Sequence, residues 1–276
     1  LVGAHLQRIV DVLDAVPEQA PGAARSIPAL TGRIEVRQVS FRYAPTAPLA
    51  VNDVSFSIEP GQKVALVGRS GSGKSTLAML LLGLYPTSEG TILYDGAPVS
   101  DLDLRALRGQ IGVVLQDPFL FSTTIRHNVA YHEPNLPLDD VVAAARLAAI
   151  DDEIGRMPLG YDTLLAEGGA TLSGGQRQRL QLARAIARQP RVLLLDEATS
   201  HLDVLTERQV DANLSRLSCT RIVIAHRLST IENADQILVF RDGSIVERGT
   251  HAQLLARDGH YAELVTSQLR PTESQR

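Results

Sequence analysis

The sequence predicts an α/β fold whose core is a parallel β-sheet. Four short segments are almost wholly aliphatic, as expected of parallel strands buried on both faces: KVALVG at 63–68, IGVVL at 111–115, VLLLDE at 192–197 and RIVIAH at 221–226. Stretches with the helical spacing of apolar residues lie between them. A glycine-rich loop follows the first segment directly and precedes an apolar helical pattern, an order that is typical of α/β domains.

Composition excludes several classes of protein. The chain has 276 residues, a net charge of −4 and 44% hydrophobic residues, which is ordinary for a globular protein. Because no long basic run is present, we expect no nucleic-acid partner. Cys219 is the only cysteine, so an internal disulfide is impossible and a small buried side chain is expected there. No apolar run approaches the ~18 residues of a membrane span, so the isolated domain should be soluble.

The first thirty residues are predicted to be a helix end and a linker. Apolar side chains recur at helical spacing within 1–16, at Leu6, Ile9, Val10 and Leu13. Prolines and small residues fill 17–32, which indicates a linker. We expect the domain itself to span 31–276.

Two further kinds of structure complete the core. Residues 33–43 and 49–61 alternate between apolar and polar side chains, which predicts β-strands. Residues 117–189 read mostly as helix, which predicts a helical insertion in the α/β core. The basic stretch at 177–188 is interpreted as a solvated face of one of these helices.

The C-terminal part is predicted to contain a hairpin and a helix. DQILVF and GSIVERG flank Asp242-Gly243, a dipeptide that favours a tight hairpin turn. The following stretch at 251–269 is predicted to be helical, and the polar tail from Arg270 is expected to fray.

The glycine-rich loop matches the phosphate-binding pattern G-x-x-x-x-G-K-[ST]. Its glycines let backbone N–H groups converge on phosphate oxygens, and the start of the next helix adds a favourable dipole. Lys74 would reach the β and γ phosphates, and the Ser75 hydroxyl would hold Mg²⁺. A plain glycine turn is the alternative. The predicted nucleotide-binding residues are Gly68, Arg69, Ser70, Gly71, Ser72, Gly73, Lys74, Ser75 and Thr76.

Two acids follow a second apolar strand. Asp196 ends the strand and would orient Mg²⁺ through water, and Glu197 would polarise a water for in-line attack on the γ-phosphate. A pair of caps for the next helix is the alternative. Gln116 and His226 also follow apolar strands, so all these side chains should meet at the carboxyl edge of the sheet. Gln116 could bind Mg²⁺ or the attacking water, and His226 could hydrogen-bond the γ-phosphate.

A second glycine-bearing loop, ATLSGGQRQRL at 170–180, has no lysine and no strand in front of it. With Tyr43, GRSGSGKST, Gln116, VLLLDE, SHLD and His226, it stands in the order and spacing of an ATP-binding cassette (ABC) nucleotide-binding domain. The resemblance covers about residues 31–270. It implies a P-loop NTPase (RecA-like) core with an antiparallel β subdomain and an inserted helical signature subdomain of about 117–189.

The resemblance implies that two such domains pack head to tail around two ATP molecules. Each ATP would touch the phosphate loop of one chain and the signature of the other, at Ser173, Gly174, Gly175 and Gln176. A simple helix cap by Ser173 is compatible with this. Tyr43 resembles the aromatic residue that stacks on adenine, with a core tyrosine as the alternative. Asp203 matches the loop that communicates across the dimer, where His201 replaces the usual alanine.

QDPFLFSTTIRHNVAY after strand 111–115 resembles the exporter form of the segment that docks on helices of a membrane domain. Phe119, Leu120 and Phe121 could instead pack inside the helical subdomain. The resemblance implies the ATPase module of an ABC exporter at the cytoplasmic face of the membrane. Its partners would be the transmembrane domain of the same transporter, from which residues 1–30 descend, and a second copy in an ATP-dependent homodimer.

Other functions stay open at the level of the sequence. A soluble ABC ATPase of the DNA-repair or translation type is the main alternative, and the exporter-like segment argues against it. The signature and His226 argue against a P-loop kinase or GTPase. LSGGQRQRLQLARAI and TERQVDANL resemble bacterial peptide or bacteriocin exporters more than multidrug exporters, and export of a lipid or a drug stays open.

Overall fold

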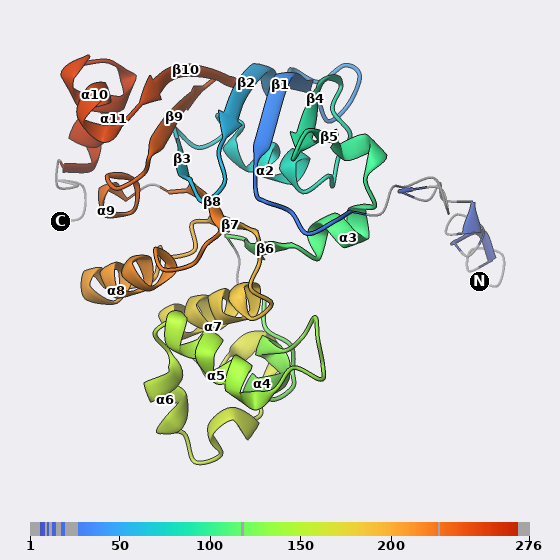
Figure 1. Cartoon of the computed structure of the whole chain (residues 1–276), viewed down its shortest axis with the longest axis vertical. Helices are drawn as coiled ribbons and strands as arrows, with labels where there is room; N and C mark the ends of the chain where they lie inside the picture. Colours follow the sequence, from blue (N-terminus) through green and yellow to red (C-terminus); the bar gives the residue numbers. More distant parts are fainter. Residues whose placement is uncertain are drawn as a thin grey trace.

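The computed structural model describes residues 6–8, 10, 13–14, 18–19, 27–116, 119–225 and 227–269. Within the helix predicted over 1–16, residues 6–8, 10 and 13 are helical, Asp14 forms a bend, and the others lie outside the described residues. The tail from Arg270 lies outside them as well. Figure 1 shows two lobes, with both sheets in one and most of the inserted helices in the other.

The antiparallel subdomain is a four-stranded sheet in the order β2-β1-β4-β5. It contains β1 (Ile34–Phe41), β2 (Val51–Ile58), β4 (Glu89–Tyr94) and β5 (Ala97–Pro98). β1 pairs antiparallel with both β2 and β4. The apolar positions of these strands are buried, and their polar neighbours are mostly exposed, as the alternating pattern predicts.

The second sheet has six strands in the order β10-β9-β3-β8-β7-β6. They are β3 (Lys63–Val67), β6 (Ile111–Val114), β7 (Val192–Asp196), β8 (Thr220–Ile224), β9 (Gln236–Arg241) and β10 (Ser244–Gly249). β3, β8, β7 and β6 pair in parallel, as predicted, and β9 also pairs in parallel with β3. β9 and β10 form the predicted hairpin, with φ angles of 48° at Asp242 and 82° at Gly243.

This sheet separates two hydrophobic cores because successive side chains of each strand point to opposite faces. Val64 and Leu66 pack with the antiparallel sheet and α2 (Lys74–Leu81). Ala65 and Val67 pack with the inserted helices and with α8 (Val204–Leu214). Burial on both faces explains why these strands are almost wholly aliphatic.

The predicted insertion is helical throughout most of its length. It comprises α4 (Ile125–Val129), α5 (Leu138–Leu147), α6 (Asp151–Gly155), the short 3-10 turns η2 (Gly160–Asp162) and η3 (Glu167–Gly169), and α7 (Gly174–Ile186). The 3-10 turn η1 (Val99–Asp101) and α3 (Leu104–Arg108) precede it, and α9 (Leu228–Ile231) follows β8. These elements and the sheets confirm the predicted fold class.

The interpretation of 177–188 as a solvated helix face is wrong. Gln178 is 1% exposed, and Arg179 and Gln181 are each 9% exposed. Arg179 forms an ion pair with Glu153 of α6 at 2.7 Å. The polar side chains of α7 therefore contribute tertiary contacts on several sides of this helix.

The stretch predicted to be helical over 251–269 forms two helices, α10 (His251–Ala256) and α11 (His260–Leu269). Asp258 adopts a left-handed φ of 50° between them. The Glu247 carboxylate of β10 accepts hydrogen bonds from the backbone N–H groups of His260 and Tyr261, at 2.7 and 3.0 Å. This cap from another element starts a new helix.

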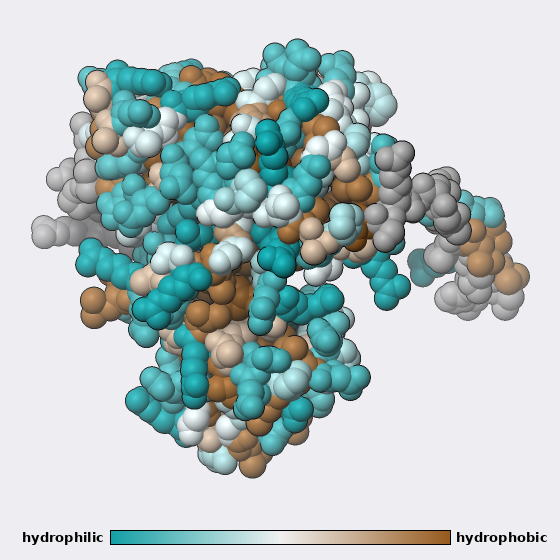
Figure 2. Space-filling model, in the orientation of Figure 1, coloured by the Kyte–Doolittle hydropathy of each residue, from teal (hydrophilic) through white to brown (hydrophobic). Residues whose placement is uncertain are grey.

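No helix among the described residues combines the length and the apolar character needed to cross a bilayer. On the face drawn in Figure 2, hydrophilic side chains cover most of the surface. Apolar ones gather at the waist where the inserted helices meet the sheet lobe. Cys219 is buried at 3% exposure, as expected.

Candidate functional site

The phosphate-loop pattern folds as a tight loop between β3 and α2. Gly68, Gly71 and Gly73 have positive φ angles of 149°, 78° and 101°. A Cβ atom on Gly73 would lie 2.3 Å from the carbonyl oxygen of Ala50, so only glycine fits where the helix begins. The loop therefore depends on its glycines for conformation and for close packing.

Lys74 lies at the centre of this loop and is 5% exposed. Its Nζ donates hydrogen bonds to the carbonyl oxygens of Gly68 and Arg69, both at 2.9 Å. Burial lowers the pKa of Lys74, and the carboxylates of Asp196 and Glu197 oppose this effect. The lysine is thus a partly desolvated cation with acids nearby, which favours interaction with a polyanion.

Ser75 and Asp196 lie together at the carboxyl edge of the six-stranded sheet. The Ser75 hydroxyl donates a hydrogen bond to Asp196 Oδ2 at 2.9 Å, and Asp196 is 4% exposed at the end of β7. A hydroxyl and a carboxylate are hard oxygen ligands of the kind that Mg²⁺ prefers. The donor set therefore fits a magnesium ion shared with a phosphate.

Glu197 and Gln116 also meet at this edge. Gln116 Nε2 donates a hydrogen bond to Glu197 Oε2 at 3.3 Å. Glu197 adopts a left-handed φ of 52°, and its N–H donates to the carbonyl oxygen of Ile224 at 2.9 Å. Such a conformation persists only where neighbouring structure holds it, and it is common at functional sites. His226, predicted to join this group, lies outside the described residues.

Lys74, Ser75, Gln116 and Glu197 line one open hollow of about 760 Å³. Its walls include Tyr43, Ser70 to Thr76, Gln116 and Glu197. Tyr43 is 58% exposed, so the core alternative is wrong. Its hydroxyl lies 3.0 Å from Thr76 Oγ1, and its ring meets Phe41 and Tyr85 edge to face. An exposed aromatic ring beside a phosphate loop is placed to stack on a base.

The second loop lies outside the lining of that hollow, since none of Ser173 to Gln176 contributes to it. Ser173 caps α7 by accepting from the Gln176 N–H at 3.2 Å, while Gln176 Oε1 accepts from the Ser173 N–H at 2.8 Å. The expected cap therefore exists. It belongs to a helix of 13 residues with no acid in its first turn, which suits an anion.

Asp203 caps α8 by accepting from the N–H groups of Leu205 and Thr206. Hydrogen bonds from Thr206 hold the pKa of Asp203 below its usual range. His201 packs against the signature of its own chain, because a Cβ atom on Gly174 would lie 3.2 Å from His201 Cδ2. The loop carrying Asp203 and the signature are therefore neighbours within one chain.

The segment after Gln116 packs only partly within the helical lobe. Leu120 is fully buried and Phe119 is 56% exposed. Phe121 stacks on Tyr131 with ring centroids 4.2 Å apart, and the Arg184 guanidinium lies over both rings. Leu120 and Phe121 thus pack within the helical lobe, and Phe119 projects from it.

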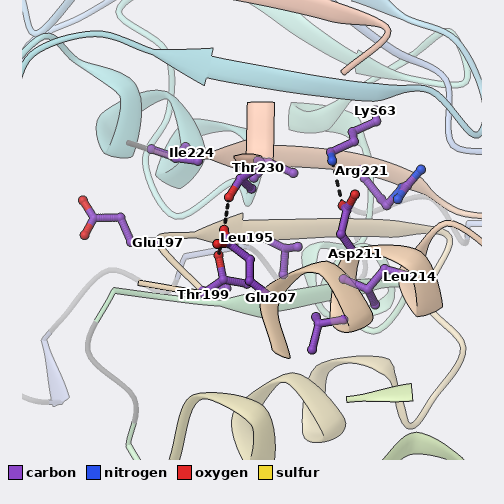
Figure 3. Close-up of a pocket in the computed structure, with 14 residues that line it drawn as sticks. Lys63, Leu195, Glu197, Thr199, Glu207, Asp211, Leu214, Arg221, Ile224 and Thr230 are labelled. Atoms are coloured by element: carbon purple, nitrogen blue, oxygen red, sulfur yellow. Dashed lines mark hydrogen bonds and ion pairs between the residues drawn. The ribbon is translucent and has the colours of Figure 1, made fainter. Parts of the chain in front are cut away.

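Sequence reasoning missed two buried polar residues beside the site. Gln178 of α7 bonds to the loop that carries Glu197. Glu207 of α8, 3% exposed, accepts hydrogen bonds from Thr199 and Thr230 beside a small pocket. The Glu197 side chain points away from this pocket (Figure 3). In the sequence both look like ordinary polar positions of amphipathic helices.

Comparison with known proteins identifies the family of this arrangement. A family model described as "ABC transporter" matches residues 51–200. The ATP-dependent lipid A-core flippase of Aromatoleum aromaticum is 50% identical over 97% of this chain and 45% of its own length. The cyclolysin secretion/processing ATP-binding protein CyaB of Bordetella pertussis is 47% identical over 95% of this chain and 37% of its own.

A solved structure is similar as well. It is described as a bacterial Atm1-family ABC exporter with ATP bound, and it superimposes with a TM-score of 0.90 at 39% identity. The alignment covers 98% of this chain and 47% of that one. The chain thus spans less than half the length of these curated relatives and of this structure.

Proposed function

The chain belongs to the ABC transporter family, and we propose that it is the ATP-hydrolysing motor domain of an exporter. ATP binding and hydrolysis are the general activities of ATP-binding domains in this family. The exporter character rests on the relatives, which are a flippase, a secretion protein and an exporter. None of these three is described as a DNA-repair or translation protein.

One observation carries the mechanism: the chain holds two half-sites that do not share a hollow. The first comprises Tyr43, the phosphate loop and Glu197, which line the open hollow, and Asp196, which bonds to Ser75. The second is the capped N-terminus of α7, at Ser173 to Gln176. We infer that two copies pack head to tail, so that each first half-site meets the signature of the other chain.

In this arrangement Lys74 and the loop N–H groups bind the ATP phosphates, and Tyr43 stacks on adenine. Mg²⁺, held by Ser75, Asp196 and Gln116, would neutralise phosphate charge when bound. Glu197 accepts a proton from the attacking water as general base. His226 contacts the γ-phosphate, and Asp203 transmits contact between the two chains.

We propose that transmembrane segments complete the transporter and place this domain at the cytoplasmic face. ATP binding closes the dimer, hydrolysis reopens it, and the membrane part selects the cargo. A polypeptide is the first candidate cargo, in line with the cyclolysin relative. A lipid is the second, because a lipid A-core flippase is 50% identical.

The experiment mixes two inactive variants. Lys74→Ala damages the phosphate loop, and Ser173→Arg damages the signature. In a mixed dimer, one site collects both lesions and the other site is intact. Random pairing makes about half of the dimers mixed, so hydrolysis should recover to about a quarter of normal if the two sites act independently and all dimers form equally well. Mixtures that recover neither hydrolysis nor ATP-dependent association would refute the composite site.

A further inference from the structure

The side-chain amide of Gln178 forms its hydrogen bonds with one loop, residues 197–201. It is 1% exposed, in the second turn of α7. Its Nε2 donates to the carbonyl oxygen of Glu197 at 3.1 Å and to Ser200 Oγ at 2.8 Å. Its Oε1 accepts from the His201 N–H at 2.9 Å. A primary amide has two N–H donors, so both are used within residues 197–201.

The bond to Glu197 acts where the backbone is strained. Glu197 has a φ of 52°, a conformation that non-glycine residues rarely adopt. Its N–H is held by Ile224 of β8 and its carbonyl oxygen by Gln178 of α7. These two bonds fix both peptide planes around the Glu197 Cα atom. They therefore fix the direction in which its carboxylate leaves the backbone.

The same helix begins at the signature. Ser173 and Gln178 belong to one regular helix, and His201 packs on Gly174 at its first turn. The loop at 197–201 thus touches α7 twice, once through the His201 ring and once through the Gln178 amide. A displacement of the signature end of α7 carries Gln178 with it, because a helical turn is stiff.

We propose that Gln178 is a positioning residue for Glu197. Through it, the helix that presents the signature to the nucleotide of the partner also orients the general base of its own chain. This inference rests on the proposed function. It does not require Gln178 to touch ATP.

Gln178→Glu tests the hydrogen bond from Gln178 to the carbonyl oxygen of Glu197. The carboxylate keeps the shape and an acceptor for the His201 N–H, but it sets an oxygen against the Glu197 carbonyl. We expect kcat to fall about 10- to 100-fold, the scale of a small misplacement of a reacting group, with the KM for ATP within about 2-fold of normal. Gln178→Met, which removes every bond, should lose at least as much.

Gln181→Leu is the matched control on the same helix. Gln181 is 9% exposed, and its Oε1 has no hydrogen-bond partner within the described part of the chain. Its replacement should leave kcat unchanged. Retention of more than half of normal kcat by both Gln178 variants, or an equal loss in the control, would overturn the proposal.

Mixed dimers separate positioning from support of the signature. In the Lys74→Ala and Ser173→Arg mixture, the working site uses Glu197 of the Ser173→Arg chain and the signature of the other chain. Adding Gln178→Glu to the Ser173→Arg chain should abolish the recovered hydrolysis. Adding it to the Lys74→Ala chain should preserve it. The opposite pattern would show that Gln178 serves the signature, and the inference would fail.

Failure of the proposed function gives a different result. If the two parent variants do not complement, the composite site is refuted whatever Gln178 does. The effect of Gln178→Glu on kcat in the otherwise unaltered chain then still tests its action on Glu197. Complementation by the parents, with normal kcat in both Gln178 variants, would refute the further inference alone.

Discussion

Replacement of Glu207 by alanine should destabilise the whole domain. The Glu207 carboxylate is 3% exposed and accepts from Thr199 Oγ1 and Ser229 Oγ, both at 3.1 Å, and from Thr230 Oγ1. Arg227 Nη1 donates to it at 3.3 Å. It therefore joins α8, α9 and the loop after β7 in one network (Figure 3).

The size of the effect follows from these contacts. Removal of one member of a buried charged network costs about 3–5 kcal/mol. The Arg227 side chain is 41% exposed and also bonds to the carbonyl oxygens of Ser200 and Leu202. Its charge therefore keeps solvent contact and hydrogen-bond partners when Glu207 is removed. We therefore expect about 3 kcal/mol, at the lower end. For a domain of this size that corresponds to a fall in Tm of about 5 °C.

Thermal unfolding followed by circular dichroism measures this shift. Glu133→Ala is the control, because its carboxylate is 53% exposed and lies 3.8 Å from Arg188. The free energy of unfolding of the control should change by less than about 0.5 kcal/mol. A Tm for Glu207→Ala within about 1 °C of the unaltered chain would refute the reasoning that this network is stabilising.

Three further outcomes are expected. Glu197→Gln should lower the ATP turnover rate about 10²–10⁴-fold while ATP still binds, and near-normal turnover would exclude it as general base. Tyr43→Ala should weaken ATP binding, measured by calorimetry, by about 1–3 kcal/mol, which is the contribution of a base–aromatic stack. Unchanged ATP affinity in Tyr43→Ala would argue against stacking. Lys74→Ala should abolish productive ATP binding. Cys219, whose pKa is raised by burial, should react with a thiol reagent only after denaturant is added, and rapid reaction of the folded chain would contradict its burial.

The sequence predicted the fold correctly where the residue pattern that indicates an element lies within that element. The β3 segment is aliphatic because both faces of its sheet are covered, and Asp242-Gly243 turns because both residues accept a positive φ. The break between α10 and α11 was missed because its cap, Glu247, comes from β10. No pattern within 251–269 contains that carboxylate.

The candidate site divides in the same way. The conformation of the phosphate loop depends on glycines within the loop itself, so its geometry could be predicted from residues 68–76. The contact of Gln178 with Glu197 depends on how α7 lies against the loop after β7. Glutamines alternating with arginines look like a solvated surface until the packing of that helix is known.

Helix α7 connects several parts of the candidate site in addition to the signature at its N-terminus. Its first turn contacts His201, its second turn holds the Glu197 carbonyl through Gln178, and its last turns carry Arg184. The Arg184 guanidinium donates to the carbonyl oxygens of Phe119 and Asn128, and burial lowers its pKa to about 10. Arginine remains protonated at neutral pH with such a pKa, so these bonds persist. A movement at either end of α7 is therefore expected to reach both the loop that carries Glu197 and the segment that exposes Phe119.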